Sequence, residues 1–133
     1  TISKKKEENI MVKEALNNFK KKVFDDYTNF HLNMMNQMSN QVYKDAGEKS
    51  SKEAIEKFKD NFSMEETRYY YKFISDGGVH SFIVKEDKEI RGKFWKKGDI
   101  LKPASWKTPA LNKARGNIFE NYIVKWTGPL YLR

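Results

Sequence analysis

One uninterrupted helical pattern of about thirty residues limits the folds that are open to this chain. Over residues 10–43, apolar side chains recur at steps of three and four, which is the period of an amphipathic helix. The apolar positions are Val12, Leu16, Phe19, Val23, Tyr27, Phe30, Met34, Met38 and Val42. Neither glycine nor proline occurs before Gly47. A helix of this length would exceed about 45 Å, so its apolar stripe needs a second element or a second copy to pack against.

A second helix is expected to fold back on the first. Asp45-Ala46-Gly47 predicts the end of the long helix, and Ser50 with Glu53 fits a capping box that starts the next one. The apolar face of this second helix would consist of Ala54, Ile55, Phe58 and Phe62. We therefore predict a helical hairpin over residues 1–66, which packs on the rest of the chain or forms a homo-oligomer through the 10–43 helix.

Beyond residue 66 the apolar period changes to two, which is typical of strands. The turn Asp76-Gly77-Gly78 predicts a hairpin of strands 68–75 and 79–85. Further short strands are expected at 91–95, 100–101, 117–119, 122–126 and 129–133. Thr108-Pro109 and Gly116 have the spacing of a helix start and stop. The predicted fold class is α+β: a helical hairpin (1–66), then a small, strongly bent antiparallel sheet or barrel (67–133) with one short helix.

The positive charge is confined to the predicted β domain. Residues 1–66 contain 12 Lys/Arg and 12 Asp/Glu, whereas residues 67–133 contain 14 and 6, so the net charge of +8 lies in the second half. Aromatic residues follow the same trend, with 7 in the first half and 12 in the second. There is no cysteine, no apolar run long enough for a membrane span, and no apolar segment after the basic first residues. We therefore expect neither a membrane partner nor a secretory signal.

One long motif in the second half resembles a known group of proteins. The run GDILKPASWKTPALNKARGNIF (98–119), with WTGPLYL (126–132), is similar to a motif of small uncharacterised proteins from tailed-bacteriophage genomes. The resemblance covers the last third to half of the chain. It implies a phage-encoded protein that acts in the host-cell cytoplasm or in the virion. It carries over no activity and no catalytic residue.

Basic and aromatic residues interleave in the second half, and this pattern favours a polyanion as the partner. A single-strand binder needs cations along a groove and flat rings on which bases stack. The candidate nucleic-acid-binding residues are Lys72, Trp95, Lys96, Lys97, Lys102, Trp106, Lys107, Lys113 and Arg115. Trp106, between Ser105 and Lys107 in a predicted loop, is the ring that we most expect to be exposed. The simpler interpretation is that the rings form a core and the lysines serve solubility. The predicted function is non-catalytic binding of nucleic acid, with single-stranded DNA or RNA favoured.

Interaction with a protein is the first alternative. The long helix, its methionines and the basic face would then bind an acidic host or phage protein, as part of a virion or as an inhibitor. The second alternative is a metal-dependent nuclease, for which Asp76, Asp99 and Glu120 are the candidate ligands. Asp76 and Asp99, however, each lie beside a glycine in a predicted turn.

Histidine chemistry has little support in the sequence. His31 is expected on the polar face of the long helix and His80 just past the first hairpin turn. The two are not at metal-ligand spacing, and no glycine pattern for a dinucleotide or a phosphate loop occurs. We therefore expect no catalytic residue, no metal and no cofactor.

Overall fold

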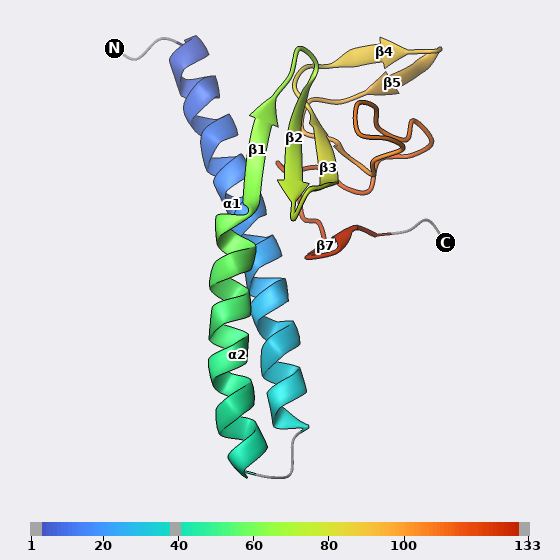
Figure 1. Cartoon of the computed structure of the whole chain (residues 1–133). Helices are drawn as coiled ribbons and strands as arrows, with labels where there is room; N and C mark the ends of the chain where they lie inside the picture. Colours follow the sequence, from blue (N-terminus) through green and yellow to red (C-terminus); the bar gives the residue numbers. More distant parts are fainter. Residues whose placement is uncertain (1–3, 38–40, 131–133) are drawn as a thin grey trace.

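Two antiparallel helices and a small twisted sheet make up the fold (Figure 1). The computed structural model describes residues 4–37 and 41–130, with side chains omitted for 41–43. Helix α1 (Lys4–Asn36) is followed by α2 (Gln41–Asp60), which runs back beside it. The predicted α+β class and the helical hairpin are confirmed. Among the described residues, no helix combines the length and the apolarity that crossing a membrane requires.

The helical hairpin turns earlier in the chain than predicted. α1 ends at Asn36, and Gly47 and Ser50 lie inside α2 rather than between the helices. The local capping signal at Ser50 is overridden because α2 packs along α1 through ring contacts, such as the 4.2 Å stacking of Phe58 on Tyr27. This pairing determines the register of the two helices. Met38 lies outside the described residues, and so does the side chain of Val42.

His31 is also placed differently from the prediction. It is buried between the helices, and its Nδ1 lies 3.0 Å from the Ser51 hydroxyl on α2. Its Nε2 is buried without a hydrogen-bond partner. The prediction that His31 lies on the polar face of the long helix is therefore wrong, because α2 covers that side of α1.

Four antiparallel strands form the main sheet. They are β1 (Phe62–Glu66), β2 (Tyr70–Ser75), β3 (Gly78–Val84) and β6 (Ile100–Leu101), in the order β1-β2-β3-β6. The predicted β2–β3 hairpin is confirmed: Ser75 pairs with Gly78, and Asp76 and Gly77 have φ of 49° and 80°. Two positive φ values in a two-residue loop define a type I′ turn, which suits the twist of the strands.

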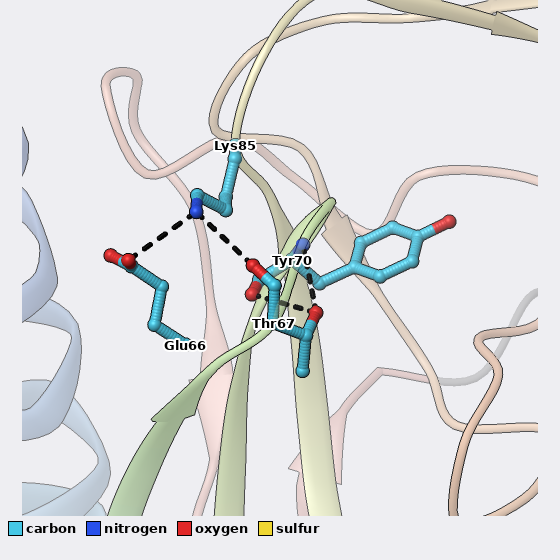
Figure 2. A network of polar contacts seen from close by, with 4 residues as sticks. All are labelled: Glu66, Thr67, Tyr70 and Lys85. Carbon is cyan, nitrogen blue, oxygen red and sulfur yellow. Dashed lines mark hydrogen bonds and ion pairs between the residues drawn. The ribbon is translucent and has the colours of Figure 1, made fainter.

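A polar network closes the turn that joins β1 to β2 (Figure 2). Thr67 N donates to Tyr70 O, and Tyr70 N donates back to the Thr67 hydroxyl. Lys85, just after β3, donates to Thr67 O and lies 3.4 Å from a Glu66 carboxylate oxygen. One lysine thus ties the β1–β2 turn to the third strand.

Two small hairpins complete the strands. β4 (Lys88–Ile90) pairs with β5 (Lys93–Trp95), and β7 (Val124–Lys125) pairs with β8 (Gly128–Pro129). The β4–β5 turn, Arg91-Gly92, has φ of 52° and 79° and is a second type I′ turn. Residues 88–90, for which no strand was predicted, therefore form one. Within the described residues the sheets form no closed barrel.

The short helix expected after Thr108 is not formed. Residues 102–119 are an irregular loop, with isolated bridges at Asp99–Asn117 and Pro103–Pro109. Near its C-terminal end, the backbone of this loop bonds to the edge of the sheet. Arg115 N donates to Ile100 O, and Ile100 N donates to Gly116 O. These non-local bonds replace the helical ones, and they also leave residues 117–119 with a bridge in place of the predicted strand.

The sheet has a different core on each of its two faces. One face packs on α1 and the β7 segment around Phe19, Phe73 and Ile83. The other face, with Phe82 and Leu101, is covered by Trp95 and by the loop after β6. The first core joins the helices to the sheet, and β1 starts at residue 62, inside the unit predicted as helical. The proposed division at residue 66 thus falls at the end of a strand that pairs with β2.

His80 is a buried neutral group in this core. Its Nε2 donates to Lys125 O over 2.9 Å, and its Nδ1 accepts from the Ser81 hydroxyl. The pKa of His80 is lowered from 6.5 to about 4. Burial is the largest cause, the bond to Lys125 O opposes it, and the Lys102 charge adds to the lowering. The pair of hydrogen bonds fixes the tautomer and connects β3 to β7.

We expect the protein to lose stability as the pH falls from 6.5 towards 4. The unfolded chain binds a proton at His80 below pH 6.5, whereas the folded chain does so only near pH 4, so the loss reaches about 3 kcal/mol. Urea unfolding across this pH range measures it. His80→Gln should remove this part of the pH dependence, whereas His31→Gln should keep it. An unchanged pH dependence in His80→Gln would contradict the assignment.

Candidate nucleic-acid interface

The second core is covered by a basic layer, which we call the outer layer and define as residues 88–117. It contains the β4–β5 hairpin and the loop after β6, and it lies away from the helices (Figure 1). Its exposed cations include Arg91, Lys93, Lys96, Lys107 and Lys113. This is the part of the chain in which sequence analysis placed most of the candidate nucleic-acid-binding residues.

A hydrogen-bonded lock holds the base of the loop. The Asn117 side chain donates to Lys97 O and to Asp99 Oδ1, and it accepts from Phe119 N over 2.9 Å. The other Asp99 oxygen accepts from Lys96 N at 2.9 Å. Asp99 and Asn117, which both belong to the 98–119 motif, therefore hold the loop in place. Asp99 has both carboxylate oxygens engaged in this way.

The loop presents Trp106 at its tip. Ala104 N and Ser105 N both donate to Thr108 O, and the Ser105 and Thr108 hydroxyls lie 2.7 Å apart. Pro103 and Pro109 form a bridge that closes the loop. Trp106 is 49% exposed, as the sequence predicted. A hollow of about 230 Å³ lies beside its ring, lined also by Val79 and by residues 103–105.

A buried lysine supports the Trp106 ring. Lys72 projects from the middle of β2, is only 4% exposed, and places its Nζ 3.9 Å from the centre of the Trp106 ring. The Phe82 ring lies on the same side of the sheet, 6.0 Å from the ammonium. Such a cation–π contact is strengthened when water is excluded. One side of the Trp106 ring is therefore held by Lys72, and about half of its surface remains open to solvent.

The structure separates the remaining predicted residues into two groups. Lys96, Lys107 and Lys113 are exposed on the outer layer, and Lys97 is half-buried. Lys102 and Arg115 instead hold residues 129 and 130: they donate to Pro129 O and Leu130 O over 2.7 and 2.8 Å. Burial, followed by the Arg115 charge, lowers the pKa of Lys102. The side chains of Lys102 and Arg115 therefore stabilise the fold through these hydrogen bonds, whether or not they also contact a ligand.

Trp95 does not belong to an exposed surface. Its ring is 1% exposed and packs in the second core with Leu101 and Val84. A buried ring cannot stack on a base, so we correct the prediction that placed Trp95 among the binding residues. The reason is the β4–β5 register, which turns Trp95 and Ile90 towards the sheet and the Glu89–Phe94 pair away from it.

Two exposed rings were not among the predicted binding residues. Phe94 is 59% exposed on β5, next to Lys93, which donates to Asn112 O across the loop. Tyr69 is 43% exposed, and Lys88 Nζ lies 3.0 Å from the centre of its ring. The strand period could have indicated Phe94, since it alternates with Trp95. The contact between Tyr69 and Lys88 requires knowledge of the fold.

The acidic residues considered for a nuclease do not gather into a site. Asp76 is in the β2–β3 turn, Asp99 is in the loop lock, and Glu120 follows the loop. Across residues 4–37 and 41–130, no three His, Asp or Glu side chains come together in a way that could hold a metal ion.

Comparison with known proteins gives one match. A protein-family model described as a family of unknown function (DUF7717) matches residues 8–131, which is nearly the whole chain. Neither the curated proteins nor the solved structures include a match to it.

Proposed function

We propose that this chain, which belongs to the family of unknown function DUF7717, binds single-stranded nucleic acid through its outer layer and catalyses no reaction. The observation that carries the proposal is the Trp106 ring, half-exposed at a loop tip and held from beneath by the buried Lys72 ammonium. The phage-like motif supports a protein that acts in the host-cell cytoplasm, with the virion as the alternative location.

A ring held in this way is suited to stacking. Trp106 is fixed by Lys72 before any ligand arrives, so binding a base on its open face costs little additional ordering. Lys107 is next to it in the chain and exposed, and Lys113 is exposed elsewhere in the same loop. These ammonium groups supply the charge that attracts a phosphate backbone.

The shape of the basic half favours a single strand over a duplex. Within residues 67–130 the structure has hairpins and loops but no helix that could enter a major groove. Exposed rings on loops and short strands are the usual means of binding unpaired bases. Exposed Phe94 and Tyr69 provide further flat surfaces around the outer layer.

Titration of labelled single-stranded DNA, RNA and duplex DNA by fluorescence anisotropy tests the proposal. We expect single strands to bind best, with affinity falling by about 0.7 log units per log unit of salt for each phosphate neutralised. Trp106→Ala should lose about 1–3 kcal/mol, the usual contribution of one stacked base.

Matched charge reversals provide the control for this titration. Lys107→Glu should weaken binding, whereas Lys52→Glu, an equal change on exposed α2, should have a much smaller effect. Equal losses in both variants would indicate a general charge effect and contradict a defined interface. Tight binding by Trp106→Ala would exclude stacking on that ring.

A second candidate function rests on a different surface. The C-terminal part of α1 exposes Phe30, Leu32 and Met34, each by more than 40%. Apolar side chains gathered on one helix end are typical of a protein-binding surface. A partner that stays bound after nuclease treatment and is lost in Leu32→Asp would favour this interaction function, and loss of the partner with the nuclease would favour nucleic acid.

A further inference from the structure

We propose that the open edge of β1 binds an extended segment of another protein as an added strand. The N-terminal half of α1 would lie beneath the added strand. Basic and apolar residues would alternate along the added strand. This site lies at the opposite edge of the sheet from β6, where the loop of the outer layer begins.

The two edges of the main sheet differ. The β6 edge is closed by the loop, because Ile100 bonds with Arg115 and Gly116, and Ala110 N donates to Lys102 O over 2.7 Å. The β1 edge ends the strand order, with β2 as its one neighbour among the described strands. An uncovered edge is a template for another extended segment.

The register shows which backbone groups of β1 are available. Thr67 N donates to Tyr70 O at the end of the hairpin, so this pair faces inwards. Inward and outward positions alternate along an antiparallel strand. Glu65 and Ser63 therefore bond with β2, while the N–H and C=O groups of Met64 and Glu66 point away from the sheet. Met64 and Glu66 are two positions apart, which is the spacing of the residues through which a further antiparallel strand forms hydrogen bonds.

α1 provides a floor for this added strand. Its N-terminal half extends past β1 on the side away from β2 (Figure 1). A groove of about 390 Å³ lies between them, lined by Asn9, Val12, Lys13, Leu16, Met64, Glu66 and Tyr71. Met64 lies on the sheet face that packs on α1, so a side chain of the added strand that points to this face enters a mainly apolar groove. An aliphatic side chain fits there.

Charge determines the other side of the added strand. Glu65 is exposed on the opposite sheet face, so residues beside it on that face should be Lys or Arg. Charged side chains on an edge strand also discourage pairing between copies of a protein. The occupant is therefore a segment of the type Lys-Val-Lys-Val-Lys rather than a second β1.

Labelled Lys-Val-Lys-Val-Lys-Val-Lys tests the proposal against its glutamate analogue, in which every lysine is replaced. We expect the basic peptide to bind and the acidic one not to. Met64→Pro removes an outward N–H that the β1–β2 ladder does not use, and it should weaken binding about tenfold. Glu65→Lys should weaken binding by about as much. On binding, hydrogen exchange at the Met64 and Glu66 amides of the unmodified chain should slow.

Three outcomes would overturn the proposal. One is the absence of binding by the basic peptide. The second is binding of the peptide without slower hydrogen exchange at the Met64 and Glu66 amides. This measurement uses the unmodified chain, so it does not depend on the folding of Met64→Pro. The third is a dimer in analytical ultracentrifugation that Met64→Pro dissociates, since the edge would then belong to a second copy. Loss of nucleic-acid binding by Trp106→Ala bears on the outer layer alone.

Discussion

Replacing Phe19 with alanine is expected to lower the free energy of unfolding by about 3–5 kcal/mol. Phe19 is fully buried, and its ring centre lies 4.9 Å from that of Phe73 on β2 and 5.9 Å from those of His80 and Tyr122. The side chain belongs to α1, but these three ring neighbours belong to the β half. Its removal should therefore destabilise the helices and the sheet together.

Denaturation followed by two signals measures this effect. Far-ultraviolet circular dichroism reports mainly the helices, and fluorescence reports the three tryptophans, Trp95, Trp106 and Trp126, which all belong to the β half. We expect one coincident transition in the unmodified chain and in Phe19→Ala, at a lower urea concentration in the variant. Phe30→Ala, on the same helix but 42% exposed, should cost much less. Two separate transitions would show that the halves are independent domains.

The sequence predicted the elements whose signals are local. The 3.6-residue period identified Val12, Leu16, Phe19 and Val23, and all four are buried. The Asp76-Gly77 dipeptide predicted a turn that requires positive φ, and the structure has it. Periodicity and turn chemistry act over a few residues, so they are readable without knowledge of the fold.

The features that the sequence did not predict depend on distant contacts. Thr108 and Gly116 have the chemistry of helix ends, but Ile100 bonds to the backbone of the loop and prevents a helix. The position of the helical turn follows from the contact of α2 with α1, which a capping signal at Ser50 cannot reveal. Local propensity is a weak guide wherever tertiary hydrogen bonds or packing compete with it.

The same distinction applies to the candidate interface. Its composition indicated a basic, aromatic surface, and Trp106 is exposed as expected. Composition could not separate Trp106 from Trp95, because both are tryptophans among lysines and only the strand register turns one of them inwards. Lys72 likewise supports a ring from below instead of facing solvent.

Gly98→Ala should cost about 3 kcal/mol or more, because it adds steric overlap to backbone strain. Gly98 has a φ of +90°, and a Cβ there would lie 2.6 Å from the Phe119 ring and 2.8 Å from Asn117 Oδ1. Gly92 provides a matched control: its φ is +79°, but a Cβ would meet nothing within 4 Å. Gly92→Ala should therefore show the strain alone, about 1–2 kcal/mol.

A double-mutant cycle separates the two parts of the Gly98 effect. In a Phe119→Ala background the ring is gone, so Gly98→Ala should cost less, while the overlap with Asn117 Oδ1 remains. An equal cost in both backgrounds would show that the ring moves aside freely. Because Asn117 also bonds to Lys97 and Asp99, displacing it should loosen the loop that carries Trp106. Faster hydrogen exchange at Ile118 and Phe119, whose amides bond to Gly98 O and Asn117 Oδ1, would show this loosening directly.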